Sequence, residues 1–156
     1  MSFPMNPSET IILLADDDDG HVSLIERNLR RAGLTHPIER FSDGQQVLDF
    51  FFLCGAARSC RKGVAYVLLL DISMPKVDGI RVLEILKGDP LRRALPVYML
   101  STTDDQREVD RCHRLGCNSY IVKPVDYDQF SRTIQTLGAF IAQLQLPPLC
   151  VADLKD

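Results

Sequence analysis

The stretch IILLADDDD at residues 11–19 decides the fold of this chain. Five apolar residues end abruptly in four consecutive aspartates, and a second apolar run, VLLL at residues 67–70, ends in the same way at Asp71. Both runs have the length and composition of buried strands. In an open parallel sheet the binding crevice lies outside the carboxyl ends of the strands, so we expect these acids to converge there. Because crowded carboxylates repel one another unless a cation joins them, the cluster predicts a hard, oxygen-preferring metal ion, most simply Mg²⁺.

Composition indicates one ordinary globular domain of 156 residues with a net charge of −3. Its basic residues are scattered and form no stripe with interleaved aromatic residues, so we expect no nucleic-acid partner. No apolar run reaches transmembrane length and the first residues do not resemble a secretion signal, so we expect no membrane contact and a cytoplasmic location. The five cysteines lack close C-x₂-C pairs and are interpreted as free thiols. The three histidines, His21, His36 and His113, lie far apart in the sequence and are interpreted as surface or structural residues.

Short apolar runs alternate with amphipathic segments along the whole chain. The predicted strands are residues 11–15, 38–41, 65–70, 97–100 and 120–122. The predicted helices are residues 21–32, a helix through 47–52 with Ser42 and Gln45 as its capping box, 79–88, 104–115 and 126–144. Five such units in succession predict an α/β fold, a doubly wound parallel sheet with helices on both faces. We expect one domain over residues 1–156, with a core at about 11–144, an N-terminal arm at 1–10 and a tail at 147–156.

Polar side chains follow four of the predicted strands. Asp16 and Asp17 follow the first strand, Asp71 the third, Ser101 the fourth and Lys123 the fifth. A lone acid in such a place is commonly a turn former or a helix cap. Carboxylates, a hydroxyl and an ammonium at four neighbouring strand ends are harder to explain as turns, and they indicate a built site.

The segment LLDISMPKVDG at residues 69–79 resembles the D-x-x-M-P-x-x-D-G segment of the response-regulator receiver family, the CheY-like phosphoacceptor domains. With the acids before it and Ser101 and Lys123-Pro124 after it, the resemblance extends over residues 11–144. It implies a flavodoxin-like (β/α)₅ fold with strand order 2-1-3-4-5. It also implies a stand-alone response regulator that takes a phosphoryl group from a sensor histidine kinase. Such a protein catalyses its own phosphorylation and dephosphorylation and is not a multiple-turnover enzyme.

The resemblance assigns the acids to phosphate acceptance and metal binding. Asp71 would be the nucleophile that receives the phosphoryl group. Asp16 and Asp17, with Asp71 and the backbone carbonyl of Ser73, would hold Mg²⁺. Four consecutive acids leave the metal pair open by one position, and Asp17 with Asp18 is the alternative.

The resemblance also assigns groups that respond to the phosphoryl group. Lys123 would place a positive charge on the phosphoryl oxygens, and Ser101 would donate its hydroxyl to them. Tyr120 matches the switch aromatic of the family, which turns into the space that Ser101 vacates. The surface that changes would comprise the fourth helix, the fifth strand and the fifth helix. By the same resemblance, the Lys123–Pro124 peptide bond is expected to be cis.

The region around residues 56–63, the sequence at 124–126 and the long last helix resemble the single-domain regulators that partner bacterial phytochrome-type kinases. In that last helix Phe140 lies off an apolar stripe that should pack on the sheet. We therefore expect a symmetric homodimer through the face described above. Its candidate interface residues are Phe140, Ile141 and Leu144.

Three other functions compete with this interpretation. A haloacid-type phosphatase would require a second acid two residues after Asp71, where Ser73 stands. A flavin or nucleotide binder would require a Gly- or Ser-rich loop after the first strand, where four carboxylates stand. A pseudo-receiver adaptor would have lost the acids, the hydroxyl or the lysine, and this chain keeps all of them.

Overall fold

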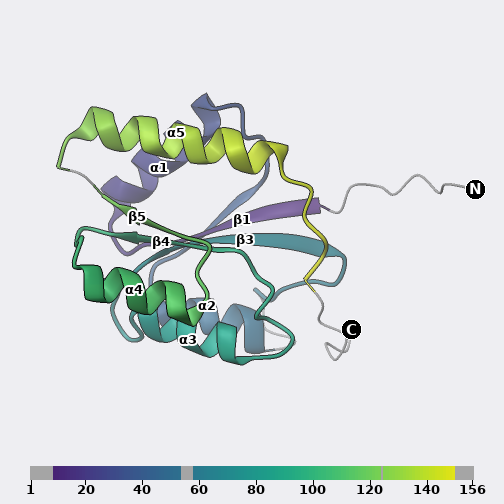
Figure 1. Ribbon diagram of the computed structural model, residues 1–156. Coiled ribbons are helices and arrows are strands. Elements are labelled where there is room, and N and C mark those ends of the chain that lie inside the picture. The colour runs from purple at the N-terminus through teal and green to yellow at the C-terminus, as the bar shows by residue number, and fades with distance from the viewer. Residues whose placement is uncertain (1–8, 54–57, 124, 150–156) are drawn as a thin grey trace, which may run out of the picture.

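The computed structural model describes residues 9–53, 58–123 and 125–149, which form three layers, with a parallel sheet between two layers of helices (Figure 1). The strands are β1 (Glu9–Ala15), β2 (Ile38–Phe41), β3 (Val64–Asp71), β4 (Val97–Ser101) and β5 (Ser119–Val122). They pair in the order β2-β1-β3-β4-β5, and every pair is parallel. The predicted α/β fold and its strand order are therefore confirmed.

Five helices connect the strands. They are α1 (Asp19–Arg31), α2 (Gly44–Phe52), α3 (Gly79–Gly88), α4 (Gln106–Leu115) and α5 (Tyr127–Gln143). Helices α1 and α5 cover one face of the sheet, and α2, α3 and α4 cover the other (Figure 1). None of the described helices is long and apolar enough to span a membrane.

An aspartate caps the N-terminus of each of these helices, and each cap accepts a hydrogen bond from a backbone N–H of the first turn. The expected capping box of Ser42 and Gln45 is wrong by one position. Asp43 caps α2 by accepting from the Gln46 N–H at 2.8 Å, and the Gln46 side chain accepts from the Ser42 N–H at 3.0 Å. The carboxylate of Asp43 is a stronger acceptor than a serine hydroxyl, and this start lets α2 bury Val47.

Strand β3 lies in the centre of the sheet and is buried along its whole length. Its side chains alternate between two cores. Leu68 and Leu70 face the core under α2, α3 and α4, whereas Val67 and Leu69 face the core under α1 and α5. This burial on both faces explains why β3 is a continuous apolar run in the sequence.

Two glycines hold the loop that follows Asp71. A Cβ at Gly44 would lie 1.9 Å from the carbonyl oxygen of Val77, so α2 begins directly against this loop. A Cβ at Gly79 would lie 2.3 Å from the carbonyl oxygen of Asp71, and the Gly79 N–H donates to the Ile72 carbonyl at 2.8 Å. The loop is therefore closed onto the end of β3, which positions the Asp71 side chain.

The last helix corrects one expectation about the dimer interface. Ile141 is 1% exposed and packs in the core under α1 and α5, so it is not available to a partner. Leu144 is half-buried against the same core, and only Phe140 of the three candidates is well exposed, at 54%. The period of the apolar stripe identified the inward face of the helix, and Ile141 belongs to that stripe.

After α5 the chain crosses the end of the sheet opposite the carboxyl ends of the strands. Leu149 is buried in the core under α2, α3 and α4, and its N–H donates to the Val64 carbonyl at 3.3 Å. The part of the expected tail that the structure describes, residues 147–149, thus packs against the fold and contributes Leu149 to its core.

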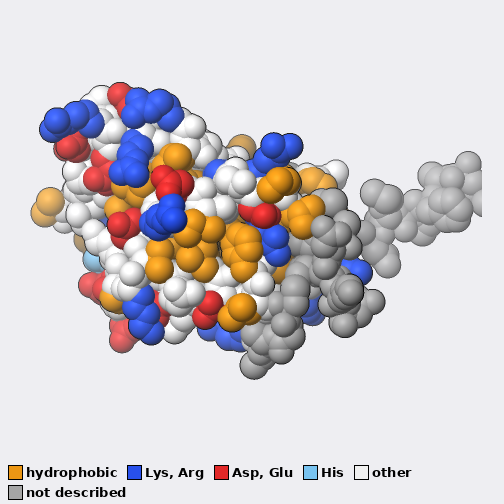
Figure 2. All heavy atoms as spheres, turned by 90° about the horizontal axis from the view of Figure 1, so that it is seen from below, with side chains coloured by type: hydrophobic (Ala, Val, Ile, Leu, Met, Phe, Trp, Pro, Cys, Tyr) orange, Lys and Arg blue, Asp and Glu red, His pale blue; other side chains and the backbone are white. Residues whose placement is uncertain are grey.

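Seen from the α2–α4 side, basic and acidic side chains are interspersed over the described surface, and hydrophobic side chains gather near its middle (Figure 2).

Candidate functional site

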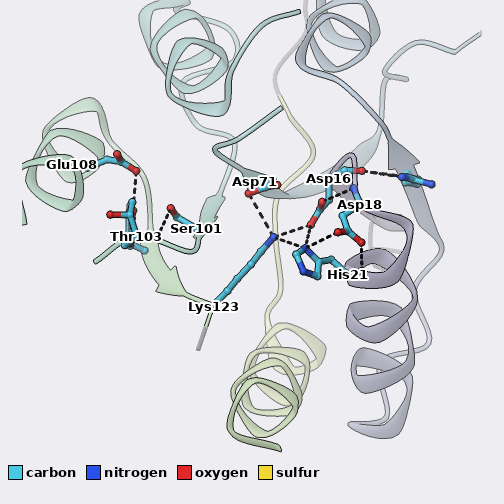
Figure 3. Close-up of polar contacts among 10 residues, drawn as sticks. Asp16, Asp18, His21, Asp71, Ser101, Thr103, Glu108 and Lys123 are labelled. Carbon is cyan, nitrogen blue, oxygen red and sulfur yellow. Dashed lines mark hydrogen bonds and ion pairs between the residues drawn. The ribbon is translucent and has the colours of Figure 1, made fainter. Parts of the chain in front are cut away.

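The carboxyl ends of the strands bring together the side chains that the sequence singled out (Figure 3). The Lys123 ammonium lies 2.9 Å from Asp16 Oδ2 and 3.5 Å from Asp71 Oδ1. Ala15 of β1 pairs with Leu70 of β3, so the next residues, Asp16 and Asp71, lie side by side. Asp16, Asp71 and Lys123 are all buried. Residues separated by more than 100 positions therefore form one charged cluster.

Carboxylate oxygens of Asp16, Asp17 and Asp71 all lie within 4.8 Å of one another. These are hard oxygen donors at the spacing of a shared cation, which fits Mg²⁺. Asp18 acts differently, because it caps α1 by accepting from the His21 N–H at 3.1 Å. This backbone hydrogen bond lowers the pKa of Asp18. The geometry therefore favours Asp16 with Asp17 over the alternative of Asp17 with Asp18.

The cluster has more negative than positive charge. The pKa of Asp71 is raised from its usual value of 3.8 to about 6, because burial and the neighbouring Asp16 raise it by more than Lys123 lowers it. The Ser73 N–H also stabilises the Asp71 carboxylate. A divalent cation at the three carboxylates would act in the same sense as Lys123 and favour the ionised, nucleophilic form.

Ser101 lies at the end of β4 and is buried. Its hydroxyl oxygen accepts from the Thr103 N–H at 3.1 Å, and its side chain also interacts with the Tyr120 hydroxyl. The Tyr120 hydroxyl lies 3.0 Å from both the Thr103 carbonyl oxygen and Glu108 Oε1. The pKa of Tyr120 is raised to about 12, because burial and Glu108 raise it by more than the Ser101 side chain lowers it. Thr103 thus links the end of β4 to β5 and α4.

His21 belongs to this site, although the sequence analysis interpreted it as a surface or structural residue. Its Nδ1 lies 3.2 Å from Lys123 Nζ and 3.7 Å from Asp16 Oδ2 (Figure 3). One signal in the sequence could have found it. His21 lies in the first turn of a helix that begins at the end of β1, and this turn faces the crevice. The expected cis bond at Lys123–Pro124 involves Pro124, which lies outside the described residues.

Comparison with known proteins finds the family that the sequence motif resembles. A model of the response regulator receiver domain matches residues 12–135. The probable methanogenesis regulatory protein FilR2 of Methanothrix harundinacea is 37% identical over 131 residues, which are 83% of this chain and 82% of FilR2. The crystal structure of a response regulator receiver domain from Rhodospirillum rubrum has 44% identity and a TM-score of 0.81, and the match covers 89% of this chain and 98% of that one.

Two further structures are informative. The Mn²⁺-bound form of response regulator Rcp1, a protein of Synechocystis, has 26% identity and a TM-score of 0.79, covering 88% of this chain and 98% of Rcp1. The bacteriophytochrome response regulator RtBRR has 35% identity and a TM-score of 0.68, covering 92% of this chain and 87% of RtBRR. The matched family model, these relatives and the shared fold together show that this chain belongs to the response regulator receiver domain family.

Proposed function

We propose that this chain is a phosphorylation switch that accepts a phosphoryl group on Asp71 from the phosphohistidine of a sensor histidine kinase. The observation that carries the proposal is the convergence of Lys123, Asp16 and Asp17 around Asp71. The match covers 98% of the Rhodospirillum rubrum receiver domain and 98% of Rcp1, which supports assigning this role to the residues of the present chain. It is not a multiple-turnover enzyme in this proposal.

The chemistry requires positioning and charge more than covalent machinery. A carboxylate oxygen of Asp71 attacks phosphorus, and the phosphorus–nitrogen bond to the kinase histidine breaks. Lys123 faces the developing charge on the phosphoryl oxygens. Mg²⁺ held by Asp16, Asp17, Asp71 and the Ser73 carbonyl would supply further positive charge at those oxygens. The similarity to the Mn²⁺-bound form of Rcp1 supports a divalent metal here.

The response to phosphorylation would pass through Ser101. Its hydroxyl would donate to a phosphoryl oxygen, and turning toward Asp71 would disturb both the hydrogen bond from the Thr103 N–H and the contact with Tyr120. The same Thr103 residue accepts from Tyr120, so a shift there would release Tyr120 from its present contacts. We propose that Ser101 and Tyr120 are the switch pair, and that the face of α4, β5 and α5 carries the signal.

A bacteriophytochrome-type kinase is the proposed partner, supported by 35% identity to the bacteriophytochrome response regulator RtBRR. The kinase would require ATP, so we propose that both proteins act in the cytoplasm.

Two alternative functions are less well supported. A haloacid-type phosphatase would require an acid two residues after Asp71, and Ser73 occupies that position. A pseudo-receiver adaptor would not need the buried Lys123 or the carboxylates of Asp16 and Asp71 beside it.

We also propose a homodimer through the α4, β5 and α5 face. Phe140 is 54% exposed and lines a cavity of about 620 Å³ between β5 and α5. The cavity is also lined by apolar atoms of Tyr98, Ile121 and Leu137. A symmetric partner would present the same Phe140 and the same cavity, so each protomer could bury the other's aromatic ring.

Asp71→Asn should abolish phosphorylation because the variant lacks the nucleophilic oxygen. Wild type incubated with Mg²⁺ and acetyl phosphate should gain one phosphoryl group by intact mass, and the gain should be lost in EDTA. Asp78→Asn is the matched control, since Asp78 caps α3 and asparagine caps as well as aspartate. Equal labelling of the Asp71→Asn protein would show that the acceptor is another residue.

Replacement of single acids should locate the metal pair. Asp16→Asn and Asp17→Asn should each weaken Mg²⁺ binding by roughly tenfold or more, because each removes a charged ligand. Asp18→Asn should leave the affinity nearly unchanged, because Asp18 caps α1 and asparagine preserves that cap. Titration calorimetry measures all three. Loss of affinity in the Asp18→Asn protein, with Asp16→Asn unaffected, would move the pair by one position.

Without metal, Asp71→Asn should stabilise the protein in a pH-dependent way. The folded-state pKa of Asp71 is raised, to about 6, so ionised Asp71 opposes folding above that pH and has no such effect below about 3.8. In EDTA the variant should gain about 1–3 kcal/mol in free energy of unfolding at pH 7.5, and the gain should fade between pH 6 and 4. Urea unfolding measures it. A gain that grows as the pH falls would contradict the charge imbalance.

Light scattering tests the homodimer. At about 50 μM, a concentration that populates a dimer with micromolar Kd, wild type should show the mass of two chains. Phe140→Glu should give a monomer because it places a charge in the apolar contact. Gln129→Glu, on an exposed position of the same helix, is the control and should remain dimeric. A monomeric wild type at this concentration would exclude the interface.

A further inference from the structure

The Lys123 ammonium lies among three acceptors. Its nitrogen is 2.9 Å from Asp16 Oδ2, 3.2 Å from His21 Nδ1 and 3.5 Å from Asp71 Oδ1 (Figure 3). An ammonium has three N–H donors, so each can be directed at one acceptor. The Lys123 side chain is only 6% exposed, so water has little access to replace a lost partner. These three contacts therefore determine where the charge sits.

Two of the three acceptors have a second role. In the proposed function Asp16 and Asp71 bind the metal, and Asp71 also receives the phosphoryl group. Each of these events takes carboxylate charge away from Lys123. His21 is not among the residues whose ligand atoms cluster at the candidate metal position. Of the three acceptors of Lys123, it is the one that neither binds the metal nor receives the phosphoryl group in the proposed function.

The Lys123 N–H donates to the Ser101 carbonyl at 2.6 Å, which holds its main chain, but the side chains of the strand before it are poorly buried. Strand β5 lies at the edge of the sheet, and none of its four residues is fully buried. Val122 is 38% exposed, and Val125 is fully exposed. The lysine side chain is long and flexible, and holding it in one place costs conformational entropy. A fixed acceptor at its tip would reduce the number of positions that the ammonium samples.

His21 has a rigid attachment. It lies in the first turn of α1, and its backbone N–H donates to the cap residue Asp18 at 3.1 Å. Nδ1 can accept from the ammonium only when the imidazole is neutral and carries its proton on Nε2. Nδ1 lies within hydrogen-bond distance of Lys123 Nζ, at 3.2 Å, and farther from the two carboxylates that it also faces, at 3.7 Å from Asp16 Oδ2 and 3.9 Å from Asp18 Oδ2.

We propose that His21 is a positioning residue for Lys123. The imidazole Nδ1 holds the ammonium beside Asp71 while Asp16 and Asp71 engage the metal, so that the charge is in place when the phosphoryl group arrives. The proposal rests on the proposed function, because it assigns His21 to the same reaction. In this proposal α1 contributes a side chain, His21, to the site, in addition to the acids that precede the helix.

His21→Ala should slow phosphorylation by acetyl phosphate about tenfold at saturating Mg²⁺, which corresponds to loss of one positioning contact. Mg²⁺ affinity by calorimetry should stay within about twofold of wild type, since His21 is not a metal ligand in the proposal. His21→Asn should keep most of the rate, because the asparagine oxygen can accept near the position of Nδ1. His36→Ala is the matched control and should react as wild type does.

A double-mutant cycle identifies the residue through which His21 acts. In a Lys123→Ala background, His21→Ala should cause no further loss of rate, because the group that it positions is already absent. Independently of phosphorylation, the ¹⁵N shift of His21 Nδ1 should report an accepted hydrogen bond in wild type and change in Lys123→Met. Backbone amide spectra of each variant confirm that it is folded.

The outcomes separate the two proposals. A wild type that gains no phosphoryl group contradicts the proposed function. A wild type that is labelled, with His21→Ala labelled at the same rate, overturns the positioning role alone. An equal loss in the presence and absence of Lys123 also overturns it, because His21 would then act through something else. An unchanged His21 Nδ1 shift in Lys123→Met would show that the hydrogen bond is absent.

Discussion

Repulsion among the carboxylates of Asp16, Asp17 and Asp71 is the constraint on which the site depends. The register of β1 against β3 enforces it, because pairing Ala15 with Leu70 leaves the next residue of each strand at the same edge. Both strands are buried, so the acids cannot separate without cost to the core. Lys123 offsets part of the repulsion, and a divalent cation would offset the rest. In the proposed metal site, the repulsion that lowers the stability of the fold would thus raise the affinity for a cation, an opposition that is common at functional sites.

Much of this site could be predicted from the sequence because strand ends are visible as sharp changes from apolar to polar. Asp16, Asp71 and Lys123 were found in this way, and β3 was recognised as central because it is apolar on both faces. His21 was missed because its partner Lys123 lies 102 positions away and no local pattern joins them. Its place in the first turn after β1 was the one available signal.

Periodicity and propensity also failed in specific ways. The stripe on α5 shows which side of the helix faces inward, but Ile141 was assigned to an interface although it lies on that side. The cap of α2 was placed one residue early because Ser42 and Asp43 are both good caps by type. Which of the two residues caps α2 depends on the close approach of Gly44 to the Val77 carbonyl. This is a tertiary contact, and residue propensities carry no information about it.

Burial divides the site into a fixed part and an adjustable part. Asp16 and Asp71 follow or end strands in the middle of the sheet, where packing on both faces holds them. Lys123 and Tyr120 belong to the edge strand β5 and the residue after it, where no side chain of the strand is fully buried. Segments with few buried contacts change conformation at the lowest free energy. In the proposed function, a charge added at Asp71 would therefore act on β5, the edge strand whose side chains are the least buried of the sheet.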